Sequence, residues 1–209
     1  MPCVLYIYYM QSVNLSMEAI DELKNILREI TGMPDKDLSV LDDLCSIKRY
    51  KKRELFLRSG HIPIYSGYIA EGAFREYYTD KNAREFNKAF CFKGDFTGSY
   101  YDLHLQKPSL VTIEALADNA VVLIDHKRYQ QLVQSDTFWL KVSYIVAHNL
   151  LMKKFEKEMQ LLTLTAAERY ALLQKCYPEL EQLVPSYHIA SYLGITPISL
   201  SRIRALRGN

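Results

Sequence analysis

The chain has 209 residues, enough for one large domain or two modest ones. A hydrophobic fraction of 49% and a charged fraction of 24% are those of an ordinary globular protein, which excludes a disordered, collagen-like or mucin-like chain. Lys and Arg number 26 against 24 Asp and Glu, and the net charge of +2 favours no class of partner. Affinity for nucleic acid would therefore have to come from local clustering of charge. The 16 Tyr residues favour a substantial β-sheet.

The cysteine and histidine residues are not spaced for metal binding. The Cys residues, at positions 3, 45, 91 and 176, form no Cys-x-x-Cys pair, and the five His form neither a His-x-His nor a His-Glu-x-x-His motif. Paired catalytic carboxylates do not stand out. We therefore expect no catalytic residue, no metal and no cofactor, and we interpret the cysteines as buried thiols in a reducing cytoplasm. A cupin-like enzyme has little support, and the chain is predicted not to be an enzyme.

The first sixteen residues are apolar but lack the basic start of a signal peptide, and their hydrophobic run over 4–9 is far shorter than the ~20 residues of a membrane helix. We interpret 1–16 as an N-terminal extension outside the fold, with Ser16 as an N-cap and Met17 as an internal start. Apolar residues at helical spacing then predict an amphipathic helix over 17–31, closed by Gly32, and a shorter helical stretch over 35–45.

Between residues 47 and 126 the pattern changes to short strand-like runs separated by turns. The expected strands cover 54–58, 65–70, 74–79, 85–92, 111–117 and 120–125, and the break at 80–82 predicts a hairpin turn. Such a series is typical of a closed or rolled antiparallel sheet. We therefore predict an α+β protein in which an antiparallel, jelly-roll-like β-roll with flanking helices occupies 17–127.

A long helix is expected over 128–163. Within it Phe138, Ile145, Met152 and Met159 recur every seven residues, with Phe155 and Leu162 as a second row. Two such rows are typical of a coiled-coil seam, whereas a helix packed only on its own sheet is the alternative. We expect a homodimer formed through Ile145, Met152, Phe155 and Met159.

The segment after Thr163 has the pattern of a helix-turn-helix domain, predicted over 164–209. Thr165 and Glu168 have the spacing of a capping box that starts a helix. Around Ala190, apolar residues and one glycine follow the helix-turn-helix spacing at Ile189, Leu193, Gly194, Ile195, Leu200 and Ile203. Thr196 is the expected N-cap of the second helix and Pro197 its first residue.

The region from Pro185 to Asn209 contains three Arg and no Asp or Glu, which favours double-stranded DNA as its partner. An ordinary helical hairpin with a few surface arginines is the alternative. Leu200 and Ile203 mark the buried side of the second helix, so the opposite side would face a major groove. The expected DNA-binding residues are Ser186, Tyr187, Pro197, Ile198, Ser199, Ser201, Arg202, Arg204 and Arg207.

A β-rich domain, a long helix and a helix-turn-helix in this order resemble the Crp/Fnr family of bacterial transcription regulators. The resemblance covers nearly everything from Met17 onward, and it is carried by Gly72-Ala73-Phe74-Arg75, Phe92-Lys93-Gly94-Asp95-Phe96, Ile113-Glu114-Ala115-Leu116, Leu193-Gly194-Ile195 and Leu200-Ser201-Arg202-Ile203. It implies a cyclic-nucleotide-binding-type β-roll, a dimerisation helix and a DNA-binding domain in which Arg202 contacts a base. It also implies a cytoplasmic protein without membrane contact, whose partners are DNA, a second copy, RNA polymerase and either an unknown small-molecule effector or none.

Two departures from the family pattern concern the effector. Cyclic-nucleotide binders have a Gly-Glu pair and an Arg-Ser or Arg-Thr pair that grips the phosphate, whereas this chain has Gly94-Asp95 and Ser109-Leu110. The ammonium of nearby Lys107 offers no bidentate fork, so we expect no tight cAMP binding. The N-terminal cysteine cluster of iron–sulfur sensors is also missing. A pocket would be lined by Asp95, Phe96, Ser99, Tyr100 and Ser109; alternatively, aromatic side chains fill it and the regulator is constitutive.

The leading hypothesis is therefore a homodimeric, sequence-specific DNA-binding transcription regulator that does not respond to cAMP. The alternative is a β-roll module that senses a small molecule or a protein, with weak or vestigial DNA binding. Binding to DNA at two salt concentrations separates the two.

Overall fold

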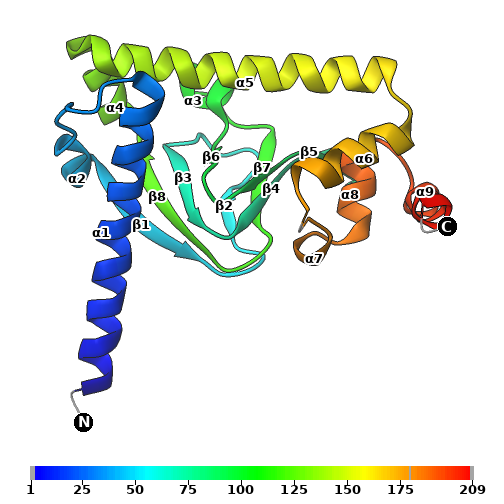
Figure 1. Ribbon diagram of the computed structural model, residues 1–209, viewed down its shortest axis with the longest axis horizontal. Helices are drawn as coiled ribbons and strands as arrows, with labels where there is room; N and C mark the ends of the chain where they lie inside the picture. The colour runs from blue at the N-terminus through cyan, green and yellow to red at the C-terminus, as the bar shows by residue number, and fades with distance from the viewer. Residues whose placement is uncertain (1–2, 179, 208–209) are drawn as a thin grey trace.

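Two four-stranded antiparallel sheets face each other at the centre of the computed structural model (Figure 1). The structure describes the backbone of residues 3–178 and 180–207 and the side chains of residues 17–178 and 180–206. The strand orders are β1-β8-β3-β6 and β2-β7-β4-β5. The strands are β1 (Cys45–Tyr50), β2 (Leu55–Leu57), β3 (Tyr65–Glu71), β4 (Ala73–Thr79), β5 (Glu85–Phe92), β6 (Phe96–Thr97), β7 (Val111–Ala115) and β8 (Asn119–Asp125), with the short helix α3 (Tyr100–Leu105) between β6 and β7. The expected antiparallel β-roll is confirmed, and β1 and β6 are additional strands.

The interior of the roll is filled by apolar side chains from both sheets. Because successive residues of a strand point to opposite faces, Phe74 of β4 points inward while Ala73 and Arg75 point outward. Inside, the rings of Tyr50 and Phe74 meet edge to face at 5.7 Å, and Phe56 packs against both. The interior is therefore a packed core.

The turn between β3 and β4 depends on a glycine. Gly72 has a φ of +90°, which L side chains rarely adopt, and a Cβ there would lie 2.2 Å from Oδ1 of Asn119. The expected hairpin between β4 and β5 is also present: the carboxylate of Asp80 accepts hydrogen bonds from the backbone N–H of Asn82 and of Arg84. These two turns fix the register of β4, the strand that carries Arg75.

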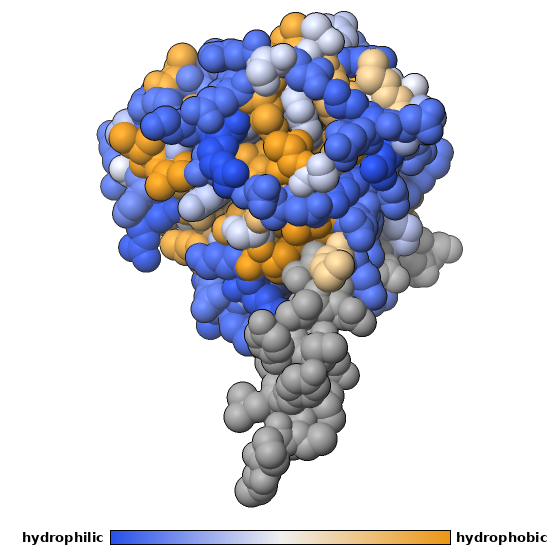
Figure 2. Space-filling model, turned by 90° about the vertical axis from the view of Figure 1, so that its left-hand side faces the viewer, coloured by the Kyte–Doolittle hydropathy of each residue, from blue (hydrophilic) through white to orange (hydrophobic). Residues whose placement is uncertain are grey.

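The helices α1 (Cys3–Thr31), α2 (Val40–Leu44) and α4 (His126–Ser135), together with the first part of α5 (Thr137–Thr163), cover the outer face of the β1-containing sheet (Figure 1). Their shared core includes Leu23, Tyr68, Phe138 and Trp139. Seen from this end, the surface is mainly hydrophilic, with apolar side chains coming to the surface near its middle (Figure 2).

Three helical segments differ from expectation, the first being the stretch expected over 35–45, of which only Val40–Leu44 is helical. The expected N-cap at Ser16 is wrong because α1 already begins at Cys3, and no Gly or Pro interrupts the sequence from there to Thr31. The single helix expected over 128–163 is two helices, α4 and α5. Asp136 breaks it, since its carboxylate accepts a hydrogen bond from the Phe138 backbone N–H at 2.8 Å and caps α5. Met1 and Pro2 lie outside the described residues, and the assignment of 1–16 to an extension stays a prediction.

The C-terminal region consists of α6 (Ala166–Cys176), α7 (Leu180–Leu183), α8 (Ser186–Leu193) and α9 (Pro197–Arg207). The capping box of Thr165 and Glu168 is present at the start of α6. The core of this region includes Tyr170, Ile189 and Leu200 and continues into Ala73, Phe90 and Leu116 on the outer face of the second sheet. Among the described helices, none is both long and apolar enough to span a membrane.

Candidate nucleic-acid interface

Helices α8 and α9 form a tight pair joined by a short turn, which we call the α8–α9 pair. Gly194 ends α8 in the left-handed conformation, with a φ of +70°, and the N–H of Ile195 donates to the carbonyl of Ala190 at 3.0 Å. The apolar residues predicted for the shared core are buried or partly buried: Ile189, Ala190, Leu193, Ile195, Leu200 and Ile203. The two helices therefore share an apolar core at the positions that the sequence predicted, and the assignment of a helix-turn-helix stays a prediction.

The start of α9 is fixed by its cap. The Oγ1 of Thr196 accepts a hydrogen bond from the Ser199 backbone N–H at 3.1 Å, and Pro197 is the first residue of the helix. The first N–H groups of a helix lack partners within the helix, so this bond satisfies one of them. The cap thereby fixes where α9 begins and which of its residues face away from α8.

The face of α9 opposite its core is exposed. Ile198 is 66% exposed, and Ser201 and Arg202 are exposed beside it, as the helical periodicity predicts. Pro197, Ser186 and Tyr187 are also exposed, whereas Ser199 is half-buried. The side chain of Arg207 lies outside the described residues. The structure therefore brings the expected groove-facing side chains onto one surface.

Arg204 has partners within the helical region itself. Its guanidinium donates to the hydroxyl of Tyr170 at 3.1 Å and to that of Ser186 at 2.8 Å, and it forms an ion pair with Glu181 at 3.1 Å. These bonds tie α9 to α6, α7 and α8. The expected contact of Arg204 with a phosphate stays a prediction, and the structure gives the residue a second role in holding the helices together.

The second half of α5 has an exposed apolar face. Met152 is 37% exposed, Phe155 55% and Met159 50%, while Ile145 is half-buried. Phe138 does not belong to this face: it is 2% exposed and packs in the core beneath α1. The difference arises because Phe138 lies on the face of α5 that packs on the core beneath α1, whereas the later residues of the seam lie on an exposed face.

The five residues expected to line an effector pocket have dissimilar surroundings. Asp95 forms an ion pair with Lys153 of α5 at 3.3 Å, and Phe96 packs on Tyr68. Ser99 donates to Asp102, and Tyr100 is half-exposed.

The fifth residue, Ser109, is buried, and its hydroxyl accepts from the Val111 backbone N–H at 3.0 Å. A surface hollow of about 570 Å³ lies elsewhere, beside β2 and the loop over 58–65, and none of the five lines it. In the described part of the chain, no three His, Cys, Asp or Glu residues are grouped to hold a metal ion.

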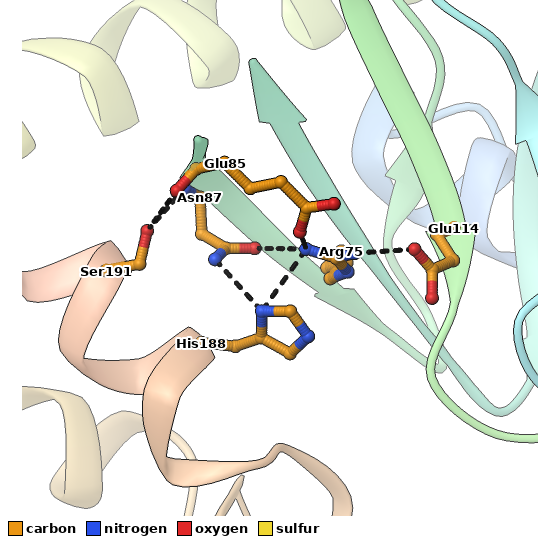
Figure 3. Close-up of polar contacts among 6 residues, drawn as sticks. All are labelled: Arg75, Glu85, Asn87, Glu114, His188 and Ser191. Atoms are coloured by element: carbon orange, nitrogen blue, oxygen red, sulfur yellow. Dashed lines mark hydrogen bonds and ion pairs between the residues drawn. The ribbon is translucent and has the colours of Figure 1, made fainter. Parts of the chain in front are cut away.

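A buried polar cluster joins α8 to the second sheet (Figure 3). Arg75 of β4 is 4% exposed and pairs with Glu85 of β5 and Glu114 of β7, each at 2.6 Å. His188 of α8 is 5% exposed, and its Nδ1 lies 3.2 Å from Nη1 of Arg75 and 3.2 Å from Nδ2 of Asn87. Burial first, and the charge of Arg75 second, lower the pKa of His188 to about 4.

Sequence reasoning assigned no role to Arg75 or His188. Arg75 alternates with inward-facing residues of β4, a pattern that indicates a solvated side chain on the outer face of a sheet. In the structure it is buried, because α8 docks on that face and the neighbouring strands supply Glu85 and Glu114. The one hint in the sequence was that His188 lies next to the apolar residues Ile189 and Ala190, which are expected to be buried. That position suggests a buried histidine but does not identify its partner.

No protein-family model matches the chain, and no curated protein sequence matches it. Solved structures do match it. FixK2 from Bradyrhizobium japonicum aligns with a TM-score of 0.67 and 20% identity over 78% of this chain and 83% of its own. CLP, a c-di-GMP-responsive global regulator from Xanthomonas campestris, aligns with a TM-score of 0.65 and 17% identity over 82% and 92%. A regulator assigned to the Crp/Fnr family from Eubacterium rectale gives 0.68 and 16% over 83% and 84%. The chain has the fold of these regulators.

At these identities the likeness establishes the fold. The Crp/Fnr-type fold of this chain exposes two surfaces with distinct chemistry: the outer face of α9 with Arg202, and the apolar face of α5 with Met152, Phe155 and Met159. They lie on different helices, so one partner can occupy each (Figure 1).

Proposed function

We propose that this protein is a sequence-specific DNA-binding transcription regulator of the Crp/Fnr type that acts as a homodimer. The observation that carries the proposal is the outer face of α9. It presents Arg202, Ser201 and Ile198 on a capped helix, and the sequence from Pro185 to Asn209 has three Arg and no acidic residue. The likeness to solved regulators supports the same function.

The proposed mode of binding places α9 in the major groove. There the guanidinium of Arg202 would read a guanine through two hydrogen bonds, and Ile198 would contact a thymine methyl group. Tyr187 and Ser186, exposed at the start of α8, are suited to phosphate contacts that set the register but carry no sequence information. RNA polymerase as a further partner stays a prediction.

A second copy of the chain is the proposed occupant of the α5 face. Phe155 and Met159 are each about half exposed, and burying such side chains stabilises association by roughly 25 cal/mol per Å² of apolar area. Two copies paired along α5 would present two α9 helices, one for each half-site of a two-fold symmetric operator.

We further propose that the regulator does not respond to cAMP. The hydroxyl of Ser109 bonds to its own backbone segment, and the ammonium of Lys107 lies 4.1 Å above the exposed ring of Tyr101. Arg84, another candidate cation, pairs with Asp80 at 2.7 Å. A phosphate would therefore lack the bidentate guanidinium that holds it most strongly.

Selection of binding sequences from a pool of random DNA duplexes tests the proposal. The selected duplex and a scrambled duplex are then compared by fluorescence anisotropy at about 50 and about 200 mM salt. We expect the selected sequence to bind at least ~10³-fold more tightly, with both affinities falling as salt rises. Equal affinity for the two duplexes would overturn the proposal and favour a sensing β-roll with vestigial DNA binding.

A further inference from the structure

The contact between α8 and the second sheet combines polar and apolar parts. We call its polar part the α8 seat, formed by Arg75, Asn87, His188 and Ser191 (Figure 3). The hydroxyl of Ser191 accepts from the Asn87 backbone N–H at 3.0 Å and donates to the Glu85 carbonyl at 3.2 Å. Sheet residues thus contact one face of α8 through hydrogen bonds, of which those at His188 are buried and those of Ser191 lie nearer the surface.

The seat requires His188 to be neutral. Both groups at its Nδ1, the guanidinium of Arg75 and the side-chain amide nitrogen of Asn87, are donors, so Nδ1 must accept. The single proton of the ring therefore lies on Nε2. A second proton would place a positive charge 3.2 Å from Arg75 and leave the Asn87 amide without its acceptor.

We propose that the α8 seat is a proton-sensitive switch that holds the C-terminal helices on the β-roll while His188 is neutral and releases them when His188 is protonated. The apolar part of the contact, in which Phe90 packs against Tyr192 at 5.1 Å, keeps the helices docked at neutral pH. Protonation of the buried His188 ring opposes this docking. The proposal concerns docking and does not depend on DNA binding.

The charges around His188 act in opposite directions. Burial of the ring opposes protonation most, and the charge of Arg75 on β4 opposes it as well. From β5, Glu85 favours protonation, and from β7 Glu114 acts through Arg75; both carboxylates are already paired with the guanidinium. On α8 itself the neighbour is the ring of Tyr187, at 4.0 Å. The opposing effects dominate, so the pKa of the docked His188 is about 4.

The direction of the pH effect follows from this difference. Once α8 is released, His188 regains its ordinary pKa of about 6.5 and binds a proton more readily than in the docked state. The contribution of neutral His188 to docking is therefore fully present above about pH 6.5 and is lost as the pH falls toward about 4. At about pH 5 the docking equilibrium should be about 30-fold less favourable than at about pH 7.5.

Distance measurement between two spin labels in the full chain tests the switch. Labels on Lys81→Cys in the exposed β4–β5 turn and Ser201→Cys on α9 report docking, with Cys3 and Cys176 replaced by Ser. Dilution with unlabelled protein removes distances between subunits. The wild-type background is compared with His188→Asn, whose Oδ1 is bonded to Cγ as Nδ1 is and can accept the same bonds but does not titrate. The matched control is His61→Asn, which replaces an exposed histidine of the roll.

We expect the wild type and His61→Asn to show longer, broader distances between about pH 6.5 and about 4, and His188→Asn to stay docked. His126, whose pKa burial also lowers, is retained in every variant. A pH-dependent change that persists in His188→Asn would therefore come from another group and would overturn the proposal. A second test follows the protonation of the His188 ring by NMR and requires no substitution of that residue. If the distance between the two spin labels stays constant over the pH range in which this ring titrates, the proposal is overturned.

Discussion

Lys157 of α5 lies over the ring of Tyr192 in α8, with its Nζ 3.9 Å from the ring centroid. The same ammonium donates to the Lys88 carbonyl of β5 at 2.6 Å, so one side chain joins the long helix, the roll and the α8–α9 pair. Burial, with a smaller contribution from the charge of Lys88, lowers the pKa of Lys157 to about 8. At neutral pH the buried, protonated ammonium of Lys157 therefore lowers the free energy of unfolding.

Lys157→Met should change the pH dependence of stability. In the wild type, Lys157 loses its proton above about pH 8 in the folded state but keeps it up to about pH 10.5 in the unfolded state. The free energy of unfolding of the wild type therefore increases with pH between these two values. The Met variant lacks this gain. Between about pH 7 and about pH 10, denaturant unfolding should show the variant losing about 2 kcal/mol relative to the wild type. Lys154→Met, at an exposed position of α5, should lose nothing comparable; equal pH curves for Lys157→Met and the wild type would contradict the buried charge.

Arg202→Ala should weaken binding to the selected DNA sequence by about 1–3 kcal/mol, because an exposed guanidinium in the groove reads guanine bidentately. Binding to scrambled DNA should change little, and the fold and dimer should be intact. Anisotropy with both duplexes measures the two effects, and Arg58→Ala, an exposed arginine of the roll, is the matched control. If specific and nonspecific binding fell equally, Arg202 would not read a base.

Arg204→Ala should lower stability in the absence of DNA, by about 1–2 kcal/mol, because it removes hydrogen bonds to Tyr170 and Ser186 and the ion pair with Glu181. Arg204→Lys should recover only part of this, since an ammonium cannot reproduce the planar fork. Denaturant unfolding of the DNA-free protein measures both. Unchanged stability, combined with weaker binding to every DNA sequence and a salt slope smaller by about one, would instead show that Arg204 acts only on a phosphate.

Met152→Glu should convert the dimer to a monomer. A carboxylate in the middle of an apolar contact costs several kcal/mol per subunit when no partner neutralises it. Sedimentation velocity at micromolar concentration measures the change, and DNA affinity should fall with it. Leu150→Glu, which places the same charge on the side of α5 away from the expected seam, should remain dimeric. A wild-type protein that sediments as a monomer would refute dimerisation through α5.

Cyclic nucleotides should bind weakly or not at all. With Ser109 bonded to backbone and Lys107 over Tyr101, cAMP or cGMP at up to ~1 mM should shift the melting temperature little, because only a ligand at about a hundredfold over its Kd stabilises by ~2.7 kcal/mol. Calorimetric titration is the direct measurement. Micromolar binding would contradict this, and Lys107→Met would then show whether that ammonium supplies the missing contact.

The fold was predictable wherever local pattern decided it. The series of short strand-like runs between 47 and 126, and the turn at 80–82, predicted the roll without any contact information. Strand β1 was missed because half-buried and exposed residues follow one another in it without a continuous apolar run. The break between α4 and α5 was missed because the apolar spacing of Phe138 suits either helix; only the Asp136 cap decides.

The candidate site likewise has a part that local sequence predicted and a part that it did not. The exposed face of α9 follows from helical periodicity and the Thr196 cap, both of which are local in sequence. The seat that joins Arg75 to His188 could not be predicted, because 113 residues separate the two and their charges become buried only when two separately patterned elements dock. Arg204 illustrates the same limit, since its partners lie on three other helices.

The core that Ile189 and Leu200 share with Ala73, Phe90 and Leu116 determines how the molecule unfolds. A fragment from Thr165 onward would expose the apolar side chains that those strand residues cover, and the isolated roll would expose the strand residues themselves. Neither the isolated roll nor the C-terminal fragment would therefore have a complete hydrophobic core. At neutral pH the roll and the C-terminal helices should therefore melt together in one cooperative transition, and a substitution in the outer face of β4 should weaken both at once.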